Sequence, residues 1–408
     1  MIYSDIIIVG AGAAGLTAAI FAAGSGKKVM VLERTPQAGR KILMSGGTRC
    51  NVLPVKVTLD DYVTESSRNR MRNIFKSWSV ERCHRWFEED IGLEMACEEE
   101  SNKWFPTSNS AQEVRDLLVR KAEARGVKIS LKASVASIKK IDKNWTVTTE
   151  SGELYYAPAV IMASGGMSVP STGTDGKGHS IVRKCGHTLH PPYPALTPLK
   201  GQHPGKEPLP GVSLDVDIVP AHSNDQPFKT KRSGFVFTHH GYSGPAILDV
   251  SHVIVKQIEN EGTSNGLHVN WTGKAPVWWQ SQLEGKLDTT SLLRHNLPKR
   301  LADNLLEENG LGGIKVAQLN KDQRKRLITD LTAYPLHATG HLGFKKAEVT
   351  GGGVPLEEIN TATMESQIAL GLYLCGEILD VFGRIGGFNF YWAWVSGRLA
   401  GLSAQKDK

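Results

Sequence analysis

Cysteine is scarce in this sequence, and the cysteines present form no recognisable motif. The five residues, Cys50, Cys83, Cys97, Cys185 and Cys375, are an odd number, are widely separated and include no C-x-x-C pair. This pattern excludes a disulfide framework and a cysteine-rich zinc site. It predicts reduced thiols in a cytoplasmic protein.

Long apolar runs are also nearly absent. Residues 6–26 form an uncharged stretch long enough to cross a bilayer, and no basic residue precedes it in residues 1–5, as a signal peptide would require. The stretch begins with the β-branched run Ile6–Val9 and continues as a small-residue segment, Leu16–Ala23, with glycines between them. It therefore predicts a buried strand, turn and helix rather than a membrane span.

Strong net charge is missing as well, whereas glycine is abundant. The 408 residues carry a net charge of +7, which predicts no particular partner at this length, and the length corresponds to two or three domains. Glycine accounts for 42 residues, about 10% against a usual value near 7%. Either loops are extensive, or the backbone approaches a ligand at several places.

The first glycine cluster has the spacing of a dinucleotide-binding turn. Gly10, Gly12 and Gly15 form a G-x-G-x-x-G between a predicted strand and a predicted helix. In such a turn the glycines permit a tight bend, close approach of a pyrophosphate and helix–strand packing, and the helix N-terminus binds the phosphates. A second strand, Lys28–Leu32, is followed by Glu33, whose carboxylate is placed to bind ribose hydroxyls. The acid favours NAD or FAD over NADP.

Further motifs extend this pattern into a family resemblance. Gly39-Arg40-Lys41 and Ser45-Gly46-Gly47-Thr48-Arg49-Cys50-Asn51 follow the second strand, and the C-terminal part contains 243–248, 350–354, 371–380 and 386–389. Together these segments resemble the glutathione-reductase-like FAD superfamily. More narrowly, they resemble the HI0933/YhiN-like flavoproteins, which include BaiN-like and aminoacetone-oxidase-like members. Thr48 stands where that family has glycine, and residues 250–340 match only weakly.

The resemblance implies FAD as cofactor and a set of residues that contact it. Val135 is expected over the adenine, Glu377 near the ribityl chain or a pyrophosphate-linked water, and the helix that starts at 388 is expected to point at the flavin pyrimidine. The expected FAD contacts are Gly10, Gly12, Ala13, Ala14, Gly15, Glu33, Arg34, Gly39, Arg40, Lys41, Ser45, Gly46, Gly47, Cys50, Asn51, Val135, Ala163, Ser164, Gly165, Gly166, Gly376, Glu377, Gly386, Gly387, Phe388 and Asn389.

The predicted fold is α/β, with a Rossmann-like FAD-binding domain of the glutathione-reductase type built from both chain ends. We expect its first part at 1–193 and its C-terminal part at 335–408. A β-rich, barrel-like inserted domain is expected at 194–275 and a helical subdomain at 276–334. Residues 60–95 read as helices, 111–125 as an amphipathic helix, and 127–132, 135–141, 145–149 and 153–156 as an antiparallel meander.

Catalytic candidates are fewer and less specific. Arg49 could anchor an anionic group, Tyr391 and Arg384 are expected near the isoalloxazine, and His240 could deliver a proton near neutral pH. Paired histidines such as His239 and His240 are more often structural. A catalytic acid or base is not obligatory, because the flavin itself performs hydride transfer. His337 and His341 have helical metal spacing, but the neighbouring glycines argue against a helix, so no metal is predicted.

The favoured function is an FAD-dependent oxidoreductase acting on a small molecule. The choice between oxidase and reductase stays open. Only one complete dinucleotide fingerprint is present, so a dedicated NAD(P)H domain is not indicated, although NAD(P)H remains a candidate transient electron donor at the flavin. Neither a membrane nor a nucleic-acid partner is expected, and the oligomeric state is not predicted. The alternatives are an RNA-modifying or RNA-binding flavoprotein, suggested by the basic cluster within 68–85, and a non-enzymatic flavin redox sensor.

Overall fold

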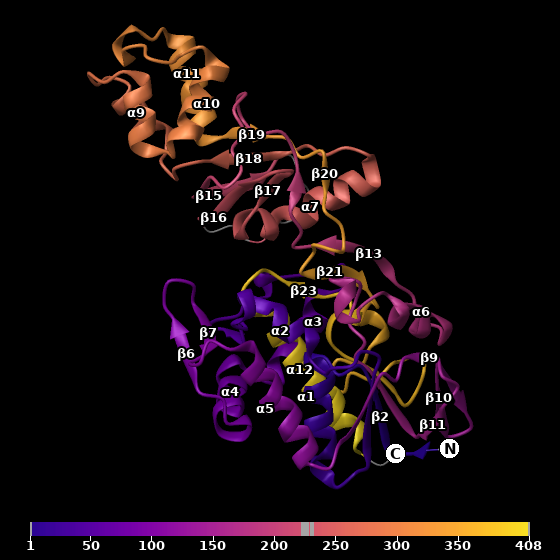
Figure 1. The fold of residues 1–408 in the computed structure, drawn as a ribbon. Coiled ribbons are helices and arrows are strands. Elements are labelled where there is room, and N and C mark those ends of the chain that lie inside the picture. Colours follow the sequence, from indigo (N-terminus) through magenta and orange to yellow (C-terminus); the bar gives the residue numbers. More distant parts are fainter. Residues whose placement is uncertain (1, 222–227, 229–231, 407–408) are drawn as a thin grey trace. The chain divides into compact units, whose positions relative to one another are not determined.

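A computed structural model describes residues 2–221, 228 and 232–406, and the chain divides into two compact units. The first unit contains Met1–Tyr193 and Val349–Lys408, and the second contains Pro194–Glu348 (Figure 1). Of the predicted β-rich segment, residues 222–227 and 229–231 lie outside the described residues.

A buried parallel sheet forms the centre of the first unit. In sheet order its strands are β22 (Leu372–Leu374), β12 (Ala159–Met162), β2 (Ile6–Val9), β3 (Val29–Glu33) and β8 (Lys128–Leu131). All side chains of β2 are buried, and β2 leads into α1 (Ala13–Ala22) through the glycine turn. The uncharged stretch is therefore the expected strand, turn and helix. Among the described residues, no helix has both the length and the apolar character that crossing a membrane requires.

The meander differs from the prediction in one strand. β9 (Val135–Ile141), β10 (Asn144–Thr149) and β11 (Leu154–Ala157) are antiparallel as expected, and β1 (Ile2–Tyr3) extends this sheet parallel to β11. Residues 127–132 were expected here, but β8 instead pairs with β3 in the parallel sheet. The reason is that α5 (Ala111–Ala124) returns the chain to the edge of the parallel sheet as a crossover.

Helices and short strands complete the first unit. The remaining helices are α2 (Arg40–Met44), α3 (Arg68–Lys76), α4 (Val80–Arg85), which continues as a π-helical turn η4 (Trp86–Ile91), α6 (Lys177–Lys184) and α12 (Phe388–Ala404). Short strands pair as β4 (Leu53–Pro54), β7 (Lys103–Pro106) and β6 (Met95–Glu98), as β5 (Tyr62–Val63) with β23 (Phe382–Gly383), and as β13 (His190–Ala195) with β21 (Val349–Gly353). The 3₁₀ turns are η1 (Ala23–Ser25), η2 (Ser45–Thr48), η3 (Leu59–Asp61), η5 (Pro170–Thr172), η7 (Leu356–Glu358) and η8 (Gly376–Ile378).

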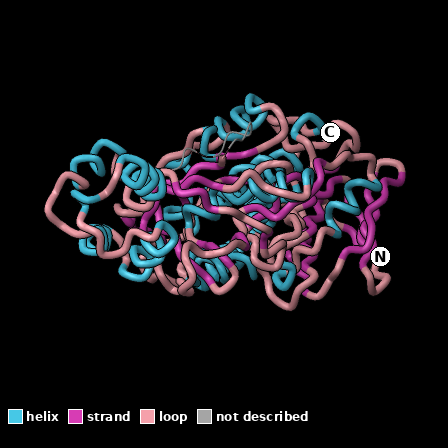
Figure 2. Tube along the Cα trace, turned by 90° about the horizontal axis from the view of Figure 1, so that it is seen from above, coloured by secondary structure: helices cyan, strands magenta, loops and turns pink. Residues whose placement is uncertain are grey.

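The second unit combines one antiparallel sheet with helices. The sheet order is β19 (Tyr334–Leu336), β18 (Leu267–Asn270), β15 (Ser213–Pro220), β16 (Ser233–Thr238), β17 (Gly241–Ser243), β14 (Leu199–Lys200) and β20 (Gly340–His341). α7 (Pro245–Glu261) contacts β15 and β16. α8 (Pro276–Gln282), α9 (Thr289–Asn296), α10 (Lys299–Asn309), η6 (Val316–Gln318) and α11 (Lys321–Thr332) form a helical group apart from the main body of this sheet (Figure 1, Figure 2).

Two expectations for this unit need correction. Residues 245–261, expected within a β-rich segment, form the helix α7, because Pro245 starts it and its apolar residues are buried. Residues 335–348, expected to rejoin the first domain, belong to the second unit, because β19 pairs with β18 and β20 pairs with β14. His337 and His341 flank and occupy these strands, and no cluster of three or more metal-ligating side chains occurs within the described ranges.

Candidate functional site

The glycine turn between β2 and α1 leaves an open, uncapped helix start. A Cβ at Gly15 would lie 1.9 Å from the carbonyl oxygen of Gly10, and one at Gly10 would lie 2.6 Å from the carbonyl oxygen of Ala163. In contrast, a Cβ at Gly12 would meet no atom within 4 Å. Gly12 is the N-cap of α1 and supplies no side-chain hydrogen bond to the first amides of the helix. Two glycines are thus required by packing, and the third is available to a phosphate.

Glu33 closes this turn at the end of β3. One carboxylate oxygen accepts from the amide of Ala11 at 2.8 Å, and the other accepts from the amide of Thr35 at 2.8 Å. The side chain is 8% exposed. The next residue, Arg34, forms an ion pair with Asp175 at 2.6 Å and reaches the carbonyl of Gly173 at 3.3 Å. The end of β3 is therefore bonded both to the glycine turn and to the loop that precedes α6.

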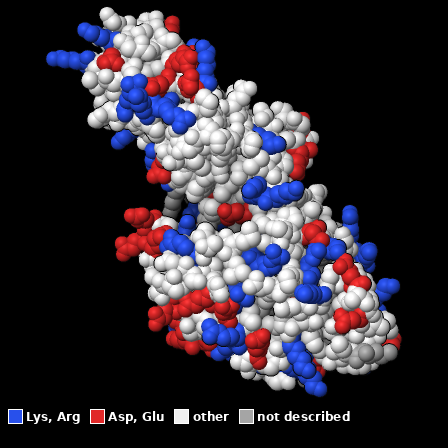
Figure 3. All heavy atoms as spheres, viewed as in Figure 1, with Lys and Arg blue, Asp and Glu red and all other residues white. Residues whose placement is uncertain are grey.

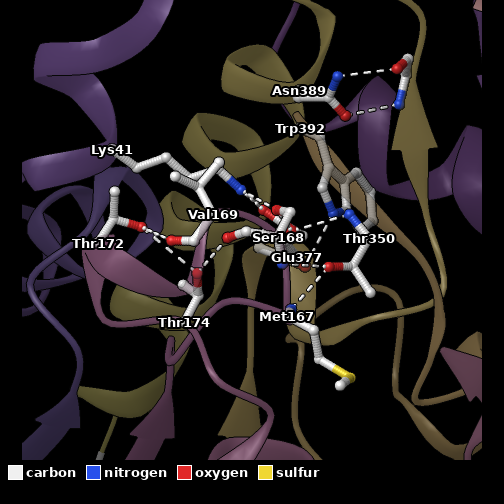
Figure 4. A network of polar contacts seen from close by, with 12 residues as sticks. Lys41, Met167, Ser168, Val169, Thr172, Thr174, Thr350, Glu377, Asn389 and Trp392 are labelled. Carbon is white, nitrogen blue, oxygen red and sulfur yellow. Dashed lines mark hydrogen bonds and ion pairs between the residues drawn. The ribbon is translucent and has the colours of Figure 1, made fainter. Parts of the chain in front are cut away.

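A polar network joins four segments that are separated in the sequence (Figure 4). Lys41 of α2 donates to Glu377 at 2.6 Å and to the hydroxyl of Ser168 at 2.5 Å, and Ser168 donates to the other Glu377 oxygen at 2.7 Å. The amide of Thr350 also donates to Glu377 at 3.0 Å, and the Thr350 hydroxyl accepts from the amide of Met167 at 2.7 Å. Lys41 and Glu377, both expected to contact FAD, thus bind each other, and their ion pair fixes α2 against η8.

The segment from Gly39 to Asn51 contains several left-handed residues. The amide of Gly39 donates to the carbonyl of Ala11 at 2.8 Å, which holds the segment against the glycine turn. Gly46 and Gly47 have φ of 56° and 65°, and a Cβ at Gly47 would meet no atom within 4 Å. Thr48 also has a positive φ of 73°, which explains physically why a glycine suits this position in the family.

Cys50 lies within this segment but is not a reactive thiol. It is fully buried, and burial raises the pKa of its thiol to about 12, against the smaller opposing effect of a hydrogen bond with Ser45. A neutral thiol is a poor nucleophile. Cys50 is therefore a packing residue of the loop rather than a redox centre.

The last helix starts with two glycines beside this loop. Gly387 is the N-cap of α12, with φ of 89° and no side-chain cap, and Gly386 has φ of 114°. The carboxamide of Asn389 accepts from the amide of Gly383 and donates to its carbonyl, both at 2.8 Å. This pair of bonds fixes the chain that enters the helix, so the α12 amides are held in one orientation.

Helices α1 and α12 run parallel in close contact, which places their N-termini at the same end. A Cβ at Gly397 would lie 2.4 Å from the carbonyl oxygen of Ala14, and a Cβ at Gly401 would lie 2.4 Å from that of Ala18. Gly397 is nine residues beyond the first residue of α12, and Ala14 is one residue beyond that of α1, so α12 starts roughly 12 Å beyond the start of α1 at 1.5 Å per residue. Two helix N-termini therefore serve one elongated site at separate points along it.

The remaining expected contacts border the same region. Gly165 has φ of 71°, and a Cβ at Gly166 would lie 2.5 Å from the Thr350 hydroxyl oxygen. The hydroxyl of Ser164 is buried and has no hydrogen-bond partner among the described residues. Val135 begins β9 and is buried. These residues fit a bound dinucleotide, which would extend from the α1 start toward the α12 start.

Two catalytic candidates of the first unit, Arg49 and Tyr391, form hydrogen bonds with other groups of the protein. The Arg49 guanidinium donates to Asn109 at 2.7 Å and Glu98 at 3.0 Å and lies 4.1 Å from the ring centroid of Phe105. Tyr391 is buried, its hydroxyl donates to the carbonyl of Trp78 at 2.6 Å, and burial raises the pKa of that hydroxyl. Tyr391 is a core residue in this structure, because its hydroxyl already has an acceptor.

The other two candidates have different surroundings. The Arg384 Nε lies 3.4 Å from an oxygen of Asp61, and its guanidinium lies 5.0 Å from the ring centroid of Phe388. It is therefore close to the α12 start. His240 belongs to the second unit, where it is exposed in the turn between β16 and β17. Its place in catalysis stays a hypothesis.

Three residues of the site were not expected from the sequence. Ser168 and Thr350 complete the network around Glu377, and Gly397 sets the helix contact. Ser168 follows Gly165-Gly166, and Thr350 precedes Gly351-Gly352-Gly353, so proximity to glycine clusters was the available signal. Gly397 and Gly401 have the G-x-x-x-G spacing that permits close helix packing, a signal that the sequence contained.

Comparison with known proteins gives a family and a fold. Residues 4–403 match the family model described as the HI0933-like protein Rossmann domain. The chain is 32% identical over 417 residues to a Haemophilus influenzae protein named ribosomal RNA dihydrouridine synthase, covering 99% of each. It is also 32% identical over 411 residues to the 3-dehydro-bile acid delta(4,6)-reductase of Clostridium scindens, covering 97% of this chain and 98% of that protein.

Solved structures of oxidoreductases share the fold at low identity. The 3-ketosteroid delta1-dehydrogenase of Sterolibacterium denitrificans matches with a TM-score of 0.55 and 12% identity, covering 100% of both chains. A flavocytochrome c3 fumarate reductase matches with a TM-score of 0.51 and 17% identity, covering 99% of this chain and 78% of that one. The Rossmann-like α/β architecture expected from the sequence is thereby confirmed.

Proposed function

The chain belongs to the HI0933-like family of FAD-dependent oxidoreductases, and we propose that it reduces a carbon–carbon double bond conjugated to a carbonyl group. The observation that carries the cofactor is Gly12, where the helix start has no side-chain cap and an added Cβ would meet no atom within 4 Å. Glu33 and the α12 start then give the same site a ribose acceptor and a second, distant helix N-terminus. This order of features fits an elongated flavin dinucleotide better than a mononucleotide.

The reaction is inferred from what the two named relatives have in common. A delta(4,6)-reductase of a 3-dehydro-bile acid reduces double bonds conjugated to the 3-oxo group, and dihydrouridine is uridine reduced at the ring double bond next to a carbonyl. The substrates differ greatly in size, but the bond that changes is of one kind. Both relatives cover nearly the whole chain, so this chemistry is our proposal for the present protein.

The chain's own residues bind and orient the cofactor in this proposal. When bound, FAD supplies the hydride chemistry. The α1 amides at Gly12 hold the pyrophosphate, Glu33 accepts from the ribose hydroxyls, and the network of Lys41, Ser168 and Glu377 lines the path between the two helix starts. The α12 amides face the pyrimidine end, where they favour the negative charge that reduction creates.

The electron donor in this proposal is NADH or NADPH, bound transiently at the flavin. The segment Val349–Gly353, which contains the other glycine triplet, is a buried strand rather than a turn before a helix. It therefore does not supply a second dinucleotide fingerprint. The five cysteines of the chain are free thiols. This observation supports the expectation of a reducing, cytoplasmic environment.

A small molecule is the favoured substrate, and a uridine of ribosomal RNA is the second candidate. The names of two relatives favour the RNA. The Haemophilus influenzae protein and an Escherichia coli protein, 31% identical over 400 residues, are both named ribosomal RNA dihydrouridine synthase. The surface shown in Figure 3 favours the small molecule, because basic and acidic side chains alternate there and acids gather over η4 and the β6–β7 hairpin. Within the basic cluster, Arg68 pairs with Asp60 at 2.6 Å and Arg70 with Glu357 at 3.7 Å.

The test begins with the absorption spectrum of the purified protein and anaerobic mixing with NADH and with NADPH. We expect a yellow protein whose flavin is bleached by one of the two nucleotides. The reduced protein is then mixed with 2-cyclohexenone, with a 3-oxo-4-ene steroid and with ribosomal RNA, and products are followed by mass increase of two hydrogen atoms. A colourless protein that takes up no FAD contradicts the proposed cofactor. Reoxidation of the reduced flavin by oxygen but by none of the three acceptors contradicts the proposed reductase activity.

A further inference from the structure

Lys103, a residue of the β6–β7 hairpin, lies directly against the glycine pair that starts α12. A Cβ at Gly386 would lie 2.5 Å from the Lys103 Cε and 3.3 Å from its Nζ. The lysine stem therefore fills the space next to Gly386, and its ammonium is beside the start of the helix. Gly386 has φ of 114°, a backbone conformation that a larger residue adopts only with strain.

The small sheet β4–β7–β6 fixes this position. Lys103 is paired with Pro54 on β4 and with Glu98 on β6. The amide of Val52 donates to the carbonyl of Trp104 at 3.0 Å, so the segment that follows Asn51 is bonded to the same hairpin. A Cβ at Gly387 would lie 3.1 Å from the carbonyl oxygen of Asn51. Lys103, the 45–51 loop and the α12 start are thus one rigid assembly.

Two sources of positive potential coincide at this place. The first is the uncapped N-terminus of α12, a helix of 17 residues, and the second is the Lys103 ammonium. The nearby carboxylate of Glu98 already binds Ser101 at 2.6 Å and Arg49 at 3.0 Å. Hydrogen bonds from Ser101 and Arg49, and to a smaller extent the charge of Lys103, hold the pKa of Glu98 below its usual value.

We propose that Lys103 faces the pyrimidine end of the flavin and stabilises its reduced form. This inference rests on the proposed function, because it requires FAD in the site. When the flavin accepts a hydride from NAD(P)H, the nucleotide is oxidised, N5 gains the hydrogen, and the electron pair leaves one negative charge on N1 and the C2 carbonyl. An ammonium beside these atoms favours the reduced ring over the neutral oxidised ring.

The test measures the flavin rather than turnover. Lys103→Met removes the charge and keeps most of the stem, Lys103→Arg keeps the charge, and Lys128→Met removes an exposed charge on β8 as a matched control. For each protein we would measure the FAD content, the melting temperature, the two-electron midpoint potential and the affinity for sulfite. Sulfite adds to N5 of oxidised flavin and places the same negative charge at N1 and the C2 carbonyl.

We expect K103M to bind sulfite about tenfold more weakly or worse, and its midpoint potential to fall by about 30 mV, the equivalent of tenfold for a two-electron couple. K103R and K128M should match the wild type in both measurements. Equal potentials and sulfite affinities in K103M and the wild type would overturn the inference. Loss of oxidised FAD from a folded K103M would also overturn it, because the lysine would then bind the dinucleotide phosphates. Absence of flavin from the wild type would instead refute the proposed function.

Discussion

Gly397 of α12 lies so close to Ala14 of α1 that an added Cβ would come within 2.4 Å of the Ala14 carbonyl oxygen. One turn later, Gly401 has the same relationship to Ala18. The first and last helices of the chain are therefore in direct backbone contact. This contact decides where the α12 start lies relative to the glycine turn, and so it sets the length of the proposed flavin site.

Substitution Gly397→Ala should separate the two helices. Alanine would normally favour a helix interior, but the clash with a backbone carbonyl should make the net effect a loss of about 1–3 kcal/mol of unfolding free energy. FAD affinity should fall as well, since the two helix starts move apart. Urea unfolding and FAD titration measure these effects. Gly312→Ala, where a Cβ would meet nothing within 4 Å, is the control and should change neither.

Gly12→Ala should separate binding from folding. The added methyl group would meet no protein atom within 4 Å, and the backbone of Gly12 has an ordinary extended conformation with φ of −78°. The melting temperature without FAD should therefore stay near that of the wild type, whereas the methyl group occupies the space of the pyrophosphate and FAD affinity should fall at least tenfold. Gly15→Ala should instead unfold the domain. Unchanged FAD binding by G12A would contradict the placement of the phosphates.

The Lys41–Glu377 pair should behave as one unit. Removing either charge leaves the other half-buried without its partner, so K41M and E377Q should each cost about 1–2 kcal/mol of unfolding free energy. The double variant should lose less unfolding free energy than the two single variants together. The reason is that the Lys41 and Glu377 side chains are only 29% and 19% exposed and meet at 2.6 Å. A double-mutant cycle by urea unfolding measures the coupling, and additive effects would show that the contact contributes nothing.

The folded protein should lose stability as the pH rises, because the Asp380 carboxyl has a raised pKa in the folded state. It is 2% exposed, and burial raises its pKa to about 6 from a usual value of 3.8. The hydrogen bond from the Glu65 amide and the charge of His190 lower this pKa, but by less than burial raises it. The folded state therefore holds a proton that the unfolded state releases. Its stabilising contribution is present below about pH 4 and disappears as the pH rises through about 6, by up to roughly 3 kcal/mol.

The comparison of the wild type with Asp380→Asn isolates this effect. Asparagine keeps an acceptor for the amides of Glu65 and Ser66 but does not titrate in this range. The stability of the wild type relative to D380N, from urea unfolding, should fall between pH 4 and pH 7. A constant difference over this range would show that Asp380 keeps an ordinary pKa.

Local patterns in the sequence predicted much of the first unit. The β-branched run Ile6–Val9 and the three glycines specified a strand, turn and helix, and an amphipathic period specified α5 almost to its ends. These features follow from short-range sterics and burial periodicity. The same approach failed for 127–132 and 245–261, because sheet partner and helix burial depend on residues far away in the sequence.

The sequence by itself predicted a dinucleotide cofactor and the end of the sheet where we propose that it binds, because glycine spacing and a terminal acid are sufficient for a dinucleotide turn. Tertiary structure decided how each polar side chain is used. Tyr391, expected near the flavin, donates its hydroxyl to the carbonyl of Trp78, and Lys41, expected to contact FAD, forms an ion pair with Glu377. Lys103, which no motif marked, came to the start of α12 through strand pairing. A side chain's partner is set by which distant segments pack against it, and only the folded chain brings those segments together.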